Sequence, residues 1–224
     1  MAKIILGLVI LASVISCQNN SSSSGSPAKK ENVVDKKVTP ASCEQEWEMM
    51  LKYGVNGKFT KYEESKFTLK GNSKILKEKN INTTKIVSND GIVIKFSEII
   101  EDLVPEVKVS EHNFELNRQK YIDDCLGEVE DLNIKRTKVL IGSENIMVRS
   151  GNFNCTHTLE TLISKEMNLE INSWTSTREP KIFIKVISKS NLVLQEGQTI
   201  PPGYEEYFAP QITETELIEA NVWN

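Results

Sequence analysis

The sequence contains only two histidines, His112 and His157, among its 224 residues. It has no Gly-x-Ser-x-Gly, His-Glu-x-x-His or phosphate-loop pattern, so the common signatures of serine hydrolases, zinc peptidases and nucleotide-binding enzymes are missing. The sequence also has no excess of basic residues, because it contains 27 lysines and arginines and 31 aspartates and glutamates. A nucleic-acid binder usually shows a positive footprint. We therefore expect a protein that is not an enzyme, uses no cofactor or metal and binds no nucleic acid.

The apolar run near the start of the chain is too short to span a membrane. It covers the twelve residues Ile4–Ile15 after the positive Lys3, whereas a spanning helix needs roughly 20. Twelve residues suit the apolar region of a secretory signal peptide. The next residues, Ser16 and Cys17, complete a boundary that resembles the lipobox of bacterial lipoproteins. The resemblance implies cleavage before Cys17, a diacylglycerol on its sulfur and acylation of its new amine, and several acyl chains together anchor a protein durably.

The segment after Cys17 has the composition of a tether. Residues 18–39 are rich in serine and polar groups and have no aromatic side chain, so they cannot bury enough surface to offset the entropy of ordering. We expect a signal peptide at 1–16, the lipidated cysteine and a disordered tether at 17–39, and one β-rich domain at 40–224. By analogy with bacterial sorting rules, Gln18 favours the outer membrane, at its periplasmic face or the cell surface.

The domain opens with a helix pattern. Ser42 and Gln45 form a capping box, Gly54 provides a stop, and Trp47, Met50 and Leu51 lie on one face. These signals predict a helix over 43–53. After it the apolar period changes to two, which is typical of strands. The expected strands lie at 58–71, 85–88, 92–96, 107–116, 134–141, 144–150, 152–163, 168–176 and 181–188, with turns at Asn89-Asp90-Gly91, Gly142-Ser143 and Ser150-Gly151.

This pattern predicts a mainly β (α+β) fold, in which a curved antiparallel sheet or half-barrel packs on one N-terminal helix, or a sandwich. Residues 148–188 also resemble exported bacterial proteins of the LolA/LolB-like half-barrel superfamily. The matching positions are Gly151, Phe153, Cys155, Trp174, Ser176, Pro180 and Ile182–Ile187. The resemblance implies a bent sheet whose concave face can hold apolar ligands. Sequence periodicity alone leaves open whether that face is a pocket or a filled core.

Three cysteines remain once Cys17 carries lipid. In the oxidising compartment expected for an exported chain, Cys43, Cys125 and Cys155 give one disulfide and one free thiol. All three pairings are possible: Cys125–Cys155 would join segments of the sheet, and the other two would attach the helix to it. We favour Cys125–Cys155.

Two other roles of these cysteines, in a zinc site and in a catalytic dyad, are less favoured by the sequence. A Cys₃His zinc site would combine Cys43, Cys125 and Cys155 with His157, but structural zinc sites usually have paired ligands two to four residues apart. A catalytic dyad of Cys155 and His157 would place both on one face of a strand, some 6–7 Å apart along it. Two carboxylate runs are expected at solvated edges or turns: Glu98–Asp102 and Asp123–Asp124.

The sequence therefore predicts a non-catalytic lipoprotein of the bacterial envelope, held to membrane lipid by its acyl anchor. Its domain would bind or carry an apolar ligand in the concave face of the sheet. The alternatives are a scaffold that contacts envelope proteins through a filled core, or an envelope hydrolase with an unrecognised site.

Overall fold

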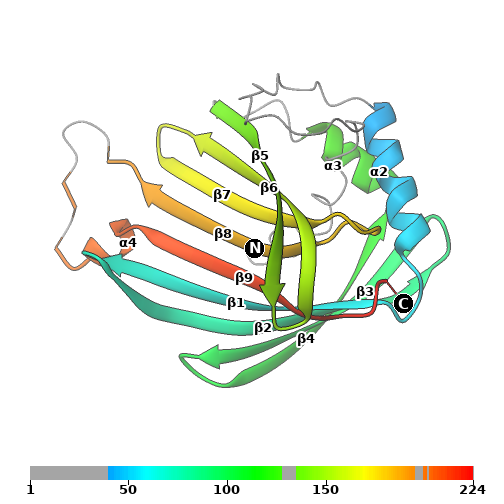
Figure 1. Cartoon of the computed structure of the whole chain (residues 1–224), viewed down its shortest axis with the longest axis horizontal. Helices are drawn as coiled ribbons and strands as arrows, with labels where there is room; N and C mark the ends of the chain where they lie inside the picture. Colours follow the sequence, from blue (N-terminus) through cyan, green and yellow to red (C-terminus); the bar gives the residue numbers. More distant parts are fainter. Residues whose placement is uncertain (1–39, 128–134, 195–198, 201, 224) are drawn as a thin grey trace.

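The computed structural model describes residues 40–127, 135–194, 199–200 and 202–223. In that part of the chain nine strands form one antiparallel sheet with the order β4-β3-β2-β1-β9-β8-β7-β6-β5. The strands are β1 Phe59–Lys70, β2 Ser73–Asn89, β3 Val93–Val104, β4 Lys108–Asn117, β5 Lys135–Val148, β6 Gly151–Ile163, β7 Met167–Ser176, β8 Phe183–Leu192 and β9 Gln211–Ala220. The helices are α2 Pro40–Tyr53, α3 Arg118–Gly127 and α4 Glu205–Phe208. The predicted fold class, a curved and mainly β structure, is confirmed (Figure 1).

The sheet consists of two meanders that meet in its middle. Strands β1 to β4 form one meander and β5 to β9 the other, and the last strand, β9, pairs with the first, β1, with Tyr62 opposite Leu217. The free edges are consequently β4 and β5. Figure 1 shows the sheet bending, with α2 and α3 at one end and the short α4 at the opposite end.

Helix α2 begins three residues earlier than predicted and ends where predicted. Pro40 opens it, which is favourable because proline lacks an N–H that the first turn would leave unbonded anyway. After Tyr53, the Gly54 N–H donates to the carbonyl of Met50 at 2.7 Å. A Cβ at position 54 would lie 2.5 Å from that oxygen, so only glycine fits this approach.

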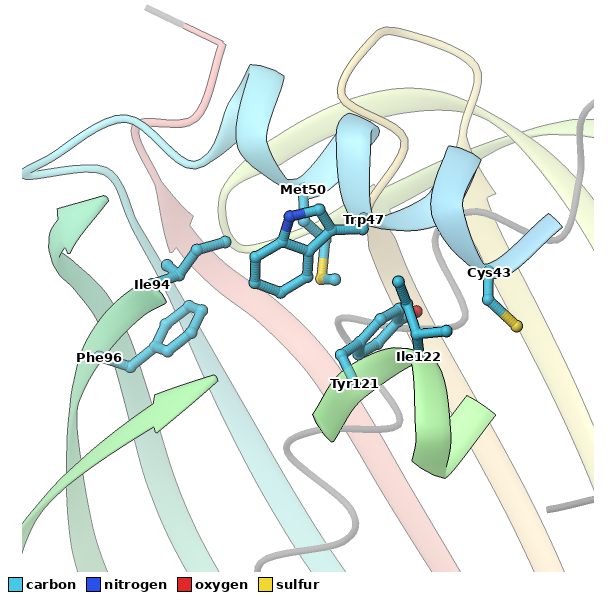
Figure 2. Packing of buried hydrophobic residues seen from close by; sticks show 7 residues of the cluster. All are labelled: Cys43, Trp47, Met50, Ile94, Phe96, Tyr121 and Ile122. Carbon is cyan, nitrogen blue, oxygen red and sulfur yellow. The ribbon is translucent and has the colours of Figure 1, made fainter. Parts of the chain in front are cut away.

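One stripe of α2 packs on the sheet. Cys43, Trp47 and Met50 are buried, at the spacing i, i+4 and i+7 that defines one helix face. They meet Ile94 and Phe96 of β3, as Figure 2 shows. Alternate residues of a strand point to the same face, so these contacts place α2 over one side of β1, β2 and β3. We call this side the helix-side face of the sheet.

The hairpin predicted at Asn89-Asp90-Gly91 is confirmed. Strand β2 ends at Asn89 and β3 begins at Val93, and Gly91 has the positive φ of 90° that the turn requires. The Asp90 carboxylate accepts hydrogen bonds from the N–H groups of Val93 at 2.7 Å and Ile92 at 2.9 Å. Because both bonds favour the ionised form, they hold the pKa of Asp90 below its usual value.

Several elements differ from the prediction. The expected turn at Gly142-Ser143 is a bulge inside the continuous strand β5, where the register with β6 shifts between Leu140 and Gly142. Strand β2 begins at Ser73 and β3 ends at Val104, so both are much longer than predicted. Strand β9 and helices α3 and α4 were not predicted, so the described part of the chain has three helices where one was expected. A signal for α3 does exist, because the Asn117 side chain accepts a hydrogen bond from the N–H of Gln119 at 3.0 Å, as a helix-capping residue does.

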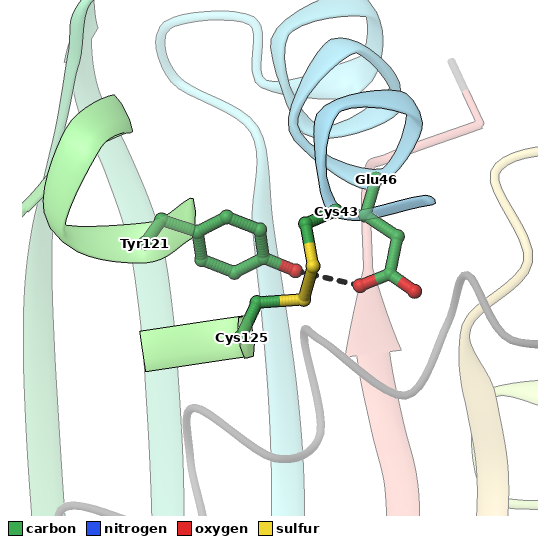
Figure 3. Close-up of a disulfide and its surroundings, with 4 residues drawn as sticks. All are labelled: Cys43, Glu46, Tyr121 and Cys125. Carbon is green, nitrogen blue, oxygen red and sulfur yellow. Dashed lines mark hydrogen bonds between the residues drawn. A yellow bond between two sulfur atoms is a disulfide. The ribbon is translucent and has the colours of Figure 1, made fainter. Parts of the chain in front are cut away.

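The favoured disulfide pairing is wrong. Cys125 bonds to Cys43, with their Cα atoms 6.1 Å apart, and Cys155 is a buried free thiol. The bond joins α2 to α3, and beside it the Tyr121 hydroxyl donates to Glu46 at 2.9 Å (Figure 3). The prediction failed because it placed Cys125 in the sheet, whereas α3 carries this residue to the helix that holds Cys43.

Candidate functional site: an apolar cleft beneath helix α2

An open cleft of about 90 Å³ lies between α2 and the helix-side face of the sheet. Its floor comes from neighbouring strands whose residues share that face by register: Thr60 lies opposite Thr84, and Ile86 lies opposite Phe96. Tyr62 and Ile94 extend this floor. Its roof is the C-terminal half of α2, with Met49, Met50 and Tyr53.

The third wall is the turn between β7 and β8, which contributes Glu179, Pro180, Lys181 and Ile182. The C-terminal residues hold this turn in place. The Trp223 indole N–H donates to the Pro180 carbonyl at 3.1 Å, and Arg178 donates to the Trp223 carbonyl at 3.0 Å. The wall is therefore positioned by contacts across the fold and not by the turn alone.

The cleft is mostly apolar, with three charged side chains in its lining: Lys58, Glu179 and Lys181. The Lys58 ammonium donates to the Asn221 carbonyl at 3.0 Å. Lys181 lies 3.8 Å from Glu179, and their side chains are 25% and 40% exposed. The lining thus carries a formal charge of about one positive unit.

Tyr62 is the buried polar group of the floor. Its hydroxyl donates to the Phe183 carbonyl at 3.0 Å. Burial raises the pKa of Tyr62 well above its ordinary value, because an ionised phenolate would lose its hydration there. The side chain is therefore neutral and serves as a structural donor rather than as an acid or base.

The proposed Cys155/His157 dyad is not formed. The two ring nitrogens of His157 face Glu144, at 2.8 Å from Nδ1, and Asn172, at 3.0 Å from Nε2, while its ring stacks on Trp174 at 4.3 Å. The thiol of Cys155 lies 3.5 Å from the Phe153 carbonyl. Burial, with a smaller contribution from Glu144, raises the pKa of Cys155 to about 11, so the thiol stays protonated at neutral pH. The arrangement does not activate a nucleophile.

The remaining predicted site residues are dispersed. Cys43 and Cys125 share the disulfide, so they cannot provide thiolates for the Cys₃His zinc site. Within the residues that the structure describes, no group of three or more His, Cys, Asp or Glu side chains is arranged to hold a metal. Cys17 lies outside the described residues.

The two carboxylate runs lie apart, one in the sheet and one on α3. Glu98 is 9% exposed and accepts a hydrogen bond from Asn82 at 2.8 Å, which makes it a buried sheet residue rather than the solvated edge that we predicted. On α3, Asp123 accepts from Gln119 at 2.9 Å and Asp124 pairs with Lys120 at 3.9 Å.

Four residues of the cleft lining were singled out in the sequence, namely Met50, Gly54, Pro180 and Ile182, but were not brought together. Thr60 looked like an ordinary member of an alternating strand, Lys181 like the start of one, and Thr84 lay outside every predicted strand. No local signal marks them, because they come from β1, β2 and a turn more than 80 residues later along the chain.

No protein-family model matches the sequence, and no curated protein matches it either. Two solved structures are similar in part. A protein of Bacteroides fragilis, described as exported and as having a YmcC-like fold, aligns with 75% of this chain and 96% of its own at 8% identity and a TM-score of 0.35. A DUF1329 family protein of Desulfovibrio piger aligns with 79% of this chain and 91% of its own at 8% identity and a TM-score of 0.22. We draw no functional conclusion from similarities of this size.

Among the described residues, none of the helices combines the length and apolar character that crossing a membrane requires.

Proposed function

We propose that this protein is a non-catalytic lipoprotein of the bacterial envelope whose domain binds a small apolar group in the cleft beneath α2. The open cleft itself is the observation that carries the proposal. Its apolar lining comes from the helix, the sheet and the β7–β8 turn together. Burying a methylene group there contributes about 0.8 kcal/mol to binding. The end of an alkyl chain would therefore bind through the hydrophobic effect, and no catalysed reaction is needed.

The size of the cleft limits what it can hold. An apolar cavity of about 150 Å³ accommodates benzene, whereas this cleft measures about 90 Å³. It suits the end of one alkyl chain, with the rest of the ligand outside. Whole acyl chains, of the kind that the half-barrel resemblance suggested, would need α2 to move away from the sheet.

The proposed location in the envelope rests on two observations. The first is the lipobox-like boundary before Cys17, which implies an acyl anchor, and the Gln18 after it, which favours the outer membrane by analogy with bacterial sorting rules. The second is the disulfide between Cys43 and Cys125, since such bonds persist in oxidising compartments and are rare in the cytosol.

The cleft can be tested with 1-octanol as the probe and the full chain carrying Cys17→Ala, so that no acyl group of the protein competes. We expect octanol to bind, and Thr60→Phe to weaken binding at least tenfold by filling the floor. Thr83→Phe is the matched control, because Thr83 lies on the opposite face of the sheet from Thr84. Calorimetry would measure each affinity. If the unmodified cleft binds neither octanol nor a charged amphiphile of the same chain length, the domain has a filled core and the scaffold alternative replaces this proposal.

The anchor calls for a separate test. Replacing Cys17 with alanine should abolish metabolic labelling with palmitate and move the protein from the membrane to the soluble fraction of the cell envelope. Cys155→Ala serves as the control and should retain both label and membrane association. Labelling that survives in Cys17→Ala would show that the anchor lies elsewhere.

A further inference from the structure

The ammonium group of Lys181 lacks a hydrogen-bond acceptor in the described part of the chain. Its side chain is only 25% exposed, and its nearest charged partner, Glu179, lies 3.8 Å away, beyond hydrogen-bond distance. An ammonium has three N–H donors, and no residue that the structure describes accepts a hydrogen bond from Lys181. Lys181 therefore presents unused donors in the lining of the cleft.

A second donor in the lining is similarly unused. The Thr60 hydroxyl forms no hydrogen bond with any residue that the structure describes, although the side chain is half-buried on the floor of the cleft. An acceptor group on a ligand could use both the hydroxyl and the ammonium. The apolar roof of Met49, Met50 and Tyr53 would meanwhile cover an alkyl chain.

We infer that the ligand of this cleft is an amphiphile with one negative charge, an alkyl carboxylate, whose head group binds to Lys181 at the mouth while its chain enters beneath α2. The inference rests on the proposed function, since it names the ligand class for the same site.

The charges of the lining favour this class over others. Lys58 and Lys181 exceed Glu179 by one positive charge, which one carboxylate neutralises. An alkylammonium head would be repelled by both lysines, and a neutral alcohol would leave the single positive excess of the lining unbalanced. A doubly charged phosphate monoester would bring a surplus negative charge beside Glu179. Hydrogen bonds to charged groups are also stronger than neutral ones.

The experiment compares octanoate, 1-octanol and octyltrimethylammonium on the full chain with Cys17→Ala, by calorimetry at pH 7 and concentrations below micelle formation. We expect octanoate to bind about tenfold or more tightly than octanol, the ratio that one charge-assisted hydrogen bond provides. Lys181→Met should bring the ratio of octanoate to octanol affinity close to one. Lys189→Met is the matched control, because Lys189 is an exposed lysine of β8 outside the cleft, and it should retain the preference.

The outcomes separate this inference from the proposed function. If octanol binds as tightly as octanoate, if the ammonium binds best, or if Lys181→Met keeps the preference, the carboxylate inference is wrong while the apolar cleft stands. If none of the three probes binds, the proposed function itself is wrong. Both the inference and the proposed function are supported if the protein prefers octanoate, if Lys181→Met removes this preference and if Lys189→Met preserves it.

Discussion

Replacing both Cys43 and Cys125 with alanine is expected to lower the free energy of unfolding by about 4.5 kcal/mol. The bond closes a loop of 82 residues. In the chain-entropy model, a cross-link that closes a loop of this length lowers the conformational entropy of the unfolded chain, and the free energy of unfolding rises by about this amount. Since a domain has only some 5–15 kcal/mol of net stability, the variant should be close to unfolding at 37 °C. Urea denaturation followed by circular dichroism measures the change.

A reducing agent provides the control for this prediction. Tris(2-carboxyethyl)phosphine should shift the urea midpoint of the unmodified protein toward that of the double variant and leave the variant's own midpoint unchanged. Cys155→Ala should remain sensitive to the reductant, because Cys155 forms no disulfide. A loss below about 1 kcal/mol in the double variant would mean that the other contacts of α2 and α3 already hold the two helices together.

The second large effect is expected at Trp47, which is fully buried beneath α2. Trp47→Ala should cost about 3–5 kcal/mol, because it removes the largest side chain of this cluster and leaves a cavity between α2 and β3. The indole ring lies 5.8 Å from the ring of Tyr121 on α3. Its loss therefore weakens the attachment of both helices to the sheet. Urea denaturation measures the resulting total change in the free energy of unfolding.

Trp47→Phe should cost much less than Trp47→Ala. The buried Nε1 of Trp47 finds no hydrogen-bond partner among the described residues, and an unsatisfied buried donor is itself unfavourable by about 1–3 kcal/mol. Trp174→Phe is the matched control, because the indole N–H of Trp174 donates to Glu144 at 2.6 Å and this bond would be lost. A cost of Trp47→Phe as large as that of Trp174→Phe would show that the indole N–H of Trp47 is satisfied.

Much of the fold was predictable from local sequence signals. The period-two pattern identified most of the strands, and Asn89-Asp90-Gly91 identified the β2–β3 hairpin, because a tight turn needs a residue that accepts positive φ. The stripe of Trp47, Met50 and Leu51 identified α2. These signals work because the residues that produce each element are neighbours in the chain.

The errors have a common cause in longer-range contacts. Helix α3 is short and carries few apolar residues, and its stability depends on the buried Tyr121 and Ile122 and on the bond from Cys125 to α2. Strand β9 was missed because its buried residues are only Thr215 and Leu217, and a bulge between Leu217 and Glu219 breaks the period of two. Strand β5 continues through Gly142 because β6 pairs on both sides of the bulge.

The sequence by itself determined the mainly β fold class, the first helix and the number of cysteines available for a disulfide, since these follow from periodicity, capping and composition. Only the tertiary structure decided which cysteines bond and where an apolar cleft opens. Cys43 bonds to Cys125, 82 residues later on α3, and the side chains that surround the cleft come from segments as far apart as β1 and the β7–β8 turn. Such juxtapositions depend on how the sheet bends and how α2 packs on it, which no local pattern encodes.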